Sequence, residues 1–227
     1  MFHFQDVEQS LYHLNSSLDR LMPVLTPLGV VVGLLLGNRI ETWGSLTPYL
    51  FAALTFVGGL GISARQFTTV IKRPKALAVF VLGSIILMPL VGWLFATLAF
   101  PSNAEIRTGI ILLTAIPTAI TGYIWSSIYQ GNEPLSLTII LIGTLLAPLT
   151  TPLIVRVLAG STVDIDSGGM MVSLLTMVVI PTALGSFINT ASRGRVNTAI
   201  TPSLKPFSKL ALFLIVIINT ARVSEQL

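Results

Sequence analysis

Long runs without any charged residue restrict the fold of this chain more than any other feature. Because a helix needs about 20 apolar residues to cross a bilayer, and a charge at its centre costs about 2.5 to 3.5 kcal/mol, we predict that each run crosses a membrane. The last run is short and reaches spanning length by beginning near Leu204, with the Lys209 amine extending to the headgroups. The predicted spans are Leu21–Asn38, Thr42–Ala64, Ala76–Ala104, Thr108–Asn132, Pro134–Val155, Ser167–Ser192 and Leu210–Ala221.

The alternative to a membrane protein is a soluble helical bundle, which needs a charged outer face on its helices. Only 10% of the residues are charged and 53% are hydrophobic, against about 25% charged in an average soluble protein. We therefore predict an all-α polytopic membrane protein, integral to the plasma membrane, with the lipid bilayer as its surroundings.

The basic residues predict the orientation of these spans. Placing the N-terminus in the cytoplasm and the C-terminus outside puts most of the 13 Lys and Arg residues inside, as the positive-inside rule requires. The outer segments also hold Asp164 and Asp166. The inner residues are Arg20, Arg65, Lys72, Arg73, Lys75, Arg193, Arg195, Lys205 and Lys209, and the outer ones are Arg39, Arg107, Arg156 and Arg222.

The segments around the spans suggest a domain organisation. Residues 1–20 carry apolar residues at intervals of three and four, which predicts an amphipathic helix on the membrane surface. A Pro-Leu-Gly at 27–29 is echoed by Pro-Thr-Ala-Leu-Gly at 181–185, five spans later. An odd separation inverts the second copy, as in many secondary transporters, although chance similarity between apolar helices would look the same. We assign residues 21–160 to a first five-helix repeat and 161–227 to the start of a second.

Polar residues gather in the fourth predicted span. Pro117 takes one backbone donor away, so carbonyls near Leu113 lose their partners and the helix must kink or open there. Exposed carbonyls are tolerated at membrane depth only inside protein or at a polar cavity, and such oxygens suit an alkali cation. The alternative is a simple proline kink in which the Thr118 and Thr121 hydroxyls bond back to the helix.

The fifth predicted span opens with a helix start and continues with hydroxyl groups. Asn132 fits an N-cap and Pro134 fits the first turn. Ser136, Thr144 and Thr151 follow at about a helical spacing and predict a hydroxyl stripe facing the fourth span. Small hydroxylated residues also serve simply as packing residues between membrane helices.

Several motifs together resemble the bile acid:sodium symporter family. The resemblance covers nearly the whole chain and is strongest from Lys72 to Gly160. It is carried by Lys-Arg-Pro-Lys at 72–75, Ile-Leu-Met-Pro at 86–89, Gly-Ile-Ile-Leu-Leu at 109–113, Gly-Asn-Glu-Pro-Leu-Ser at 131–136 and Thr-Leu-Leu-Ala-Pro-Leu-Thr-Thr-Pro-Leu at 144–153.

The resemblance implies ten helices in two inverted repeats, split into a panel domain and a core domain. In the core, two broken helices cross, and sodium and an organic anion bind near the crossing. Ser136 matches a serine ligand of sodium, and Ser84 stands where some members have a glutamine that serves a second sodium. Ile140 replaces a threonine ligand, and the family's acidic ligand has no counterpart. The candidate sodium residues are Ser136, Ser84, Thr118 and Thr121, and the candidate ion or substrate pathway comprises Pro117, Gly122, Tyr123 and Thr144.

These observations predict a secondary active transporter for a small organic anion, coupled to sodium or to protons. A membrane-embedded enzyme is the opposing hypothesis, and it lacks cysteine, an HExxH motif and any intramembrane His, Asp or Glu. We therefore expect no enzymatic activity, no nucleic-acid partner and no cofactor other than Na⁺ as coupling ion. The third hypothesis is a transport-incompetent fragment or accessory subunit, because residues 161–227 supply only two spans. On that hypothesis the chain needs the missing second-repeat helices or an oligomer for coupled transport.

Overall fold

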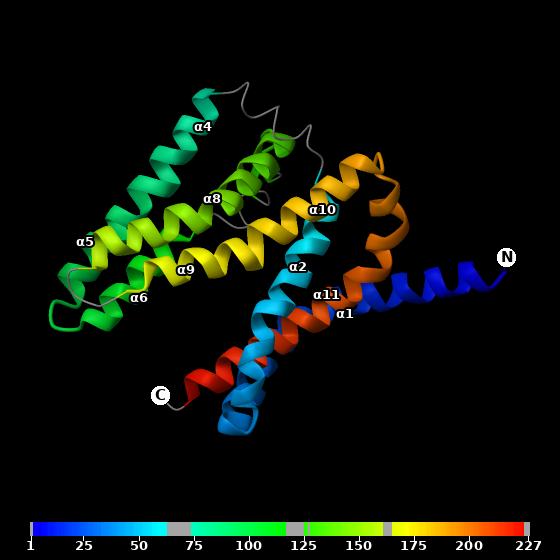
Figure 1. The fold of residues 1–227 in the computed structure, drawn as a ribbon, viewed down its shortest axis with the longest axis horizontal. Helices are drawn as coiled ribbons and strands as arrows, with labels where there is room; N and C mark the ends of the chain where they lie inside the picture. The colour runs from blue at the N-terminus through cyan, green and yellow to red at the C-terminus, as the bar shows by residue number, and fades with distance from the viewer. Residues whose placement is uncertain (1, 63–73, 117–124, 127, 161–164, 225–227) are drawn as a thin grey trace. The chain divides into compact units, whose positions relative to one another are not determined.

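A computed structural model describes the backbone of residues 2–62, 74–116, 125–126, 128–160 and 165–224, and helices form nearly all of it (Figure 1). No strand occurs within these ranges. The first part of the chain forms α1 (Phe2–Leu36), the 3₁₀ helix η1 (Gly37–Leu46) and α2 (Thr47–Leu60). The last part forms α10 (Ile180–Ala191) and α11 (Arg195–Val223).

The middle of the chain is helical as well. A π-helical segment η2 (Val81–Leu87) joins α4 (Pro74–Phe80) to α5 (Met88–Ala99). Then come α6 (Ala104–Ala115) and α8 (Glu133–Ala159). A second π-helical segment, η3 (Leu175–Val179), joins α9 (Ser167–Leu174) to α10.

The length and hydropathy of these helices fit a membrane protein. Among the described residues, 4 helices are long and apolar enough to cross a bilayer, namely Pro74–Ala99, Leu135–Ala159, Ser167–Ala191 and Arg195–Val223. Arg20–Leu36 is a shorter apolar helix. The prediction of an all-α polytopic membrane protein is confirmed.

The chain packs into two compact units. Unit 1 consists of Met1–Ser63 and Thr176–Leu227, and unit 2 consists of Ala64–Leu175. The chain passes from unit 1 to unit 2 after Ser63 and returns after Leu175, inside the π-helical segment η3. The two units are defined by how the helices pack. The predicted domains, divided at residues 20 and 160, were defined by sequence pattern and an internal repeat. The repeat stays a prediction.

Glycines allow the helices of unit 1 to approach closely. α1 packs along α11, and α2 packs on α10 and α11 (Figure 1). A Cβ on Gly33 would lie 2.6 Å from the Ile217 carbonyl oxygen of α11. Gly59 of α2 and Gly185 of α10 each face the partner helix's backbone so closely that no Cβ fits. Such close approach is typical of membrane helices, where packing and not the hydrophobic effect drives association.

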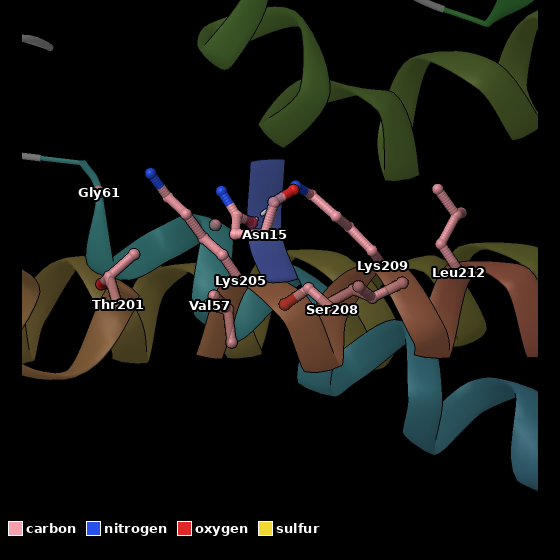
Figure 2. A pocket seen from close by; sticks show the side chains of 10 residues that line it. Asn15, Val57, Gly61, Thr201, Lys205, Ser208, Lys209 and Leu212 are labelled. Atoms are coloured by element: carbon pink, nitrogen blue, oxygen red, sulfur yellow. Dashed lines mark hydrogen bonds between the residues drawn. The ribbon is translucent and has the colours of Figure 1, made fainter. Parts of the chain in front are cut away.

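Two sequence-based boundaries differ from the structure of unit 1, and one polar contact was not predicted. The predicted surface helix and the first span are parts of the single helix α1. The second span begins as the 3₁₀ helix η1, with Ile40 in a non-helical conformation, and becomes α-helical only at Thr47. The Lys209 amine donates to the backbone oxygen and the side-chain Oδ1 of Asn15 in α1, at 2.8 and 2.6 Å (Figure 2), and its extension to the headgroups stays a prediction.

The core of unit 2 lies between α6 and α8. Ile111, Ala115, Val155 and Ala159 are buried there, and Ile165 and Met170 pack against them. α5 covers α6 at Gly92, where a Cβ would collide with the Thr114 side chain. This packing fixes the C-terminus of α6 beside the middle of α8.

Candidate functional site

The fourth predicted span is broken at the position that the sequence indicated. α6 ends at Ala115, and Ile116 adopts an extended conformation with φ −70° and ψ 130°. Pro117 explains this change, because the residue before a proline is disfavoured in the α region. The Ile116 amide donates to the Leu112 carbonyl, and the last carbonyls of a helix need partners outside its own regular pattern.

A threonine of α8 satisfies one of these carbonyls. The Thr151 hydroxyl donates to the Ala115 carbonyl oxygen at 3.1 Å, and Thr151 is only 4% exposed. The predicted hydroxyl stripe on the fifth span is thus confirmed at Thr151. It is not confirmed at Thr144, whose hydroxyl donates to the Ile140 carbonyl of its own helix at 2.9 Å.

The start of α8 has the predicted cap. The Asn132 side chain accepts a hydrogen bond from the Leu135 amide at 3.0 Å, and Pro134 lies in the first turn. The Ser136 amide donates to the Asn132 carbonyl at 2.9 Å. Ser136 therefore lies in the first turn of α8, at the positive end of the helix dipole.

Ser136 lines a small cavity within unit 2. The cavity has a volume of about 260 Å³. Its described lining residues are Phe80, Ser126, Asn132, Leu135, Ser136, Ile139 and Ile140. Three of these carry side-chain oxygens, and the others make an apolar wall. Side-chain oxygens without a carboxylate suit a weakly held hard cation or a water molecule better than a soft metal.

Ser126 was missed by the sequence reasoning. A tight turn brings it to the cavity, because the Gly131 amide donates to the Ser126 carbonyl at 2.7 Å. A Cβ on Gly131 would lie 2.8 Å from the Ser126 Oγ atom. The Gly131-Asn132 pair before the cap was the available signal for such a turn, but it does not tell which upstream residue the turn approaches.

The other predicted site residues either do not line this cavity or lie outside the described residues. Ser84 lies half-buried in the π-helical segment η2, one turn after Phe80, and is not among the described lining residues of the cavity. Thr144 is two turns farther along α8 than Ser136 and is also not among them. Pro117, Thr118, Thr121, Gly122 and Tyr123 lie outside the described residues. Within the described part of the chain, no three His, Asp or Glu residues come together as a metal site would require.

The described residues define a polytopic helical membrane protein. They form long apolar helices, one helix that ends before a proline, and a cavity lined by side-chain oxygens at the start of the next helix. The chain belongs to the Sodium Bile acid symporter family, whose family model matches residues 47–227.

Comparison with known proteins agrees with this membership. The chain is 40% identical over 205 residues to the uncharacterized protein YbaS of Bacillus subtilis, covering 89% of this chain and 66% of that protein. It is 30% identical over 162 residues to the uncharacterized sodium-dependent transporter YocS of the same organism, covering 70% and 50%.

A plant relative is also similar. The chain is 32% identical over 173 residues to the probable sodium/metabolite cotransporter BASS5, chloroplastic, of Oryza sativa subsp. indica, covering 74% of this chain and 43% of that protein. The chain thus spans between about two fifths and two thirds of the lengths of these relatives.

Proposed function

We propose that this protein takes part in sodium-coupled uptake of a small organic anion. The observation that carries the proposal is the cavity at the start of α8, which is lined by three residues with side-chain oxygens, Ser126, Asn132 and Ser136. Support for the coupling ion comes from the names of two relatives, a sodium-dependent transporter and a probable sodium/metabolite cotransporter. We propose transport as the function in place of any enzymatic activity.

The physical mechanism is alternating access. In transporters of inverted-repeat type, unwound carbonyls hold the cation, and the positive N-termini of half-helices attract an anion. Here Ser126, Asn132 and Ser136 would supply oxygens for the cation, and the first turn of α8 would supply the positive end. In this proposal unit 1 corresponds to the panel domain and unit 2 to the first part of the core domain.

The cation site is expected to be weak. Its described lining has hydroxyl and amide oxygens but no carboxylate, so it offers no full negative charge to offset the loss of hydration. Protons are the alternative coupling ion, yet no acidic or histidine side chain is present among the described lining residues to carry one. Sodium is therefore the coupling ion that we propose, and plasma membrane with a cytoplasmic N-terminus is the proposed location.

Sodium-dependent stabilisation and uptake test this proposal. The purified chain is titrated with NaCl at constant ionic strength with choline chloride, and its melting temperature is followed. We expect Na⁺ to raise the melting temperature, because an ion that binds only the folded state stabilises it. Ser136→Ala should remove most of this effect.

Thr150→Val is the matched control, because the Thr150 hydroxyl lies on the same helix and donates to its own Leu146 carbonyl at 3.2 Å. It should keep the sodium effect. The same proteins are then placed in liposomes with an inward Na⁺ gradient and supplied with radiolabelled cholate. Sodium-dependent uptake supports a transporter, whereas sodium stabilisation without uptake favours an accessory subunit. The absence of any effect of Na⁺ overturns the sodium site.

A further inference from the structure

An exposed aromatic pair lies just before α8 in unit 2. Trp125 is 58% exposed and Tyr129 is 77% exposed, and Ile128 is 61% exposed. The Tyr129 amide donates to the Trp125 carbonyl at 3.0 Å, so one helical turn separates the two residues. Their rings stack, with centroids 5.9 Å apart and an angle of 20° between the ring planes. Because residues three and four apart share a helix face, Trp125, Ile128 and Tyr129 form one apolar surface, the aromatic surface.

The backbone of this turn holds the aromatic surface in a defined place. Gln130 follows Tyr129 with φ 53°, in the left-handed region, and the Gly131 amide donates back to the Ser126 carbonyl at 2.7 Å. A left-handed residue together with such a backbone bond is the Schellman ending of a helix. Asn132 then caps α8. A closed turn thus ties the aromatic surface to the start of α8.

Ser126 and the aromatic surface have different surroundings. Ser126 is half-buried and lines the cavity at the start of α8. Trp125, Ile128 and Tyr129 are not among the described lining residues of that cavity, and each is more than half exposed. An exposed apolar patch of large side chains marks an interaction surface. The same turn therefore presents a hydroxyl to the cavity and an apolar surface to whatever surrounds unit 2.

The place of the aromatic surface along the chain favours the edge of the bilayer. The candidate membrane span of α8 begins at Leu135, shortly after Tyr129. Between these two residues, Gln130, Gly131 and Asn132 are all exposed, and their polar groups need water or lipid headgroups. Trp and Tyr are enriched at this level of a membrane, because each ring has an apolar body and a hydrogen-bond donor. A stacked Trp and Tyr pair here has the chemistry of an interfacial anchor.

We propose that Trp125, Ile128 and Tyr129 dock into the headgroup layer of the bilayer and hold the turn that carries Ser126 at that depth. The predicted orientation of the spans puts this turn at the cytoplasmic face. The indole N–H and the phenol O–H reach the polar headgroups, while the ring bodies and the Ile128 side chain lie against the acyl chains. A protein partner is the other occupant to be tested, and the exposed polar residues of the same turn favour the bilayer edge. The anchor does not depend on sodium binding and goes beyond the proposed function.

Fluorescence quenching in liposomes measures the depth of Trp125. The chain has 3 tryptophans, so Trp43→Phe and Trp93→Phe together leave Trp125 as the single fluorophore of the full chain. The liposomes contain phosphatidylcholine with bromine either near the headgroup or near the end of the acyl chain, and each intensity is taken relative to unbrominated lipid. We expect shallow bromine to quench Trp125 at least about twofold more strongly than deep bromine, as an interfacial ring requires. Iodide in the aqueous phase should quench it in part.

Trp93 provides the matched depth reference. It lies inside the candidate span Pro74–Ala99 and is 39% exposed. In the chain with Trp43→Phe and Trp125→Phe, the preference for shallow bromine should be smaller than the preference measured for Trp125. Strong quenching of Trp125 by iodide alone would place the aromatic surface in water, and stronger quenching by deep bromine would place it in the acyl chains. Protection from both quenchers would place it under a protein surface, such as a second copy of the chain. Each of these three results overturns the proposal.

A second variant tests whether the two rings dock together. Tyr129→Ser, made in the chain with Trp125 as its single tryptophan, removes the stacked ring. We expect weaker quenching of Trp125 by shallow bromine and stronger quenching by iodide. Tyr49→Ser makes the same change in unit 1, at a tyrosine that is 74% exposed, and should leave the quenching of Trp125 unchanged. Equal effects of the two substitutions, or no effect of Tyr129→Ser, contradict docking of the pair. The sodium titration does not measure the depth of Trp125, so the two proposals fail separately.

Discussion

Single residues decide how closely the helices of unit 1 approach. Gly59 and Gly185 meet where α2 crosses α10, and each lies against the backbone of the other helix. Around this crossing the Thr182 hydroxyl donates to the Thr55 carbonyl at 3.4 Å. The Asn189 side chain donates to the Ile62 carbonyl just beyond the end of α2, at 3.0 Å. Close approach and polar contacts between helices thus occur together.

Substitution of Gly59 by alanine tests this crossing. The added methyl group would overlap the Thr182 backbone, and overpacking of this kind costs about 1 to 3 kcal/mol. We expect Gly59→Ala to lower the melting temperature measured by circular dichroism in detergent. Gly58→Ala is the control, because its methyl group meets nothing within 4 Å, and it should maintain or raise the melting temperature. A lower melting temperature for Gly58→Ala alone would contradict this account.

Local features of the site were predictable from sequence, and contacts between distant segments were not. The cap at Asn132 and the break before Pro117 depend on neighbouring residues, so the sequence reveals them. The bond from Thr151 to Ala115 depends on the register between α6 and α8. The contact of Lys209 with Asn15 joins residues 194 apart in sequence. A single amino-acid sequence does not reveal such pairings, because many residues could donate to the same carbonyl or accept from the same amine.

At the level of elements, both π-helical segments precede a proline. η2 is followed by Pro89, and η3 is followed by Pro181. A proline has no amide hydrogen for the carbonyl four residues earlier, and a π-helical turn shifts the backbone pairing by one residue. In α10 the carbonyl four residues before Pro181 is that of Met177, and the Thr55 hydroxyl of α2 lies 2.6 Å from it.

A double-mutant cycle tests the link between Thr55 and Pro181. Thr55→Val removes the hydroxyl and should cost about 1 kcal/mol of folding free energy, as a net hydrogen bond does. Pro181→Ala supplies an amide hydrogen, so in that background we expect the cost of Thr55→Val to shrink toward zero. Reversible unfolding in detergent with added SDS measures the four free energies. Additive effects of the two substitutions would show that the hydroxyl does not replace the missing amide.

At the level of the whole molecule, the spans and the positive charges predict one orientation. The chain contains no cysteine, so single cysteines can be introduced without background labelling. Lys75→Cys lies at the start of α4 on the predicted cytoplasmic side, and Ser102→Cys follows α5 on the predicted outer side. Both residues are exposed.

In intact bacterial cells that express the chain, a membrane-impermeant maleimide should label Ser102→Cys and not Lys75→Cys. In inverted membrane vesicles the pattern should reverse, because orientation follows the basic residues. Disruption of the membrane with detergent should allow both to react. Labelling of both from the same side of an intact membrane would refute the predicted orientation.

The discontinuity of unit 1 along the chain has a consequence for biosynthesis. α1 and α2 emerge from the ribosome before unit 2, whereas their partners α10 and α11 emerge after it. The glycine-containing surfaces of α1 and α2 therefore lack their native partner helices while residues 64–175 are translated. Unit 2 has no such delay, since it comes from one continuous stretch. Domains generally fold as units during synthesis, so unit 2 is expected to mature before unit 1. The early helices then depend on membrane insertases or lipids until α10 and α11 have been translated.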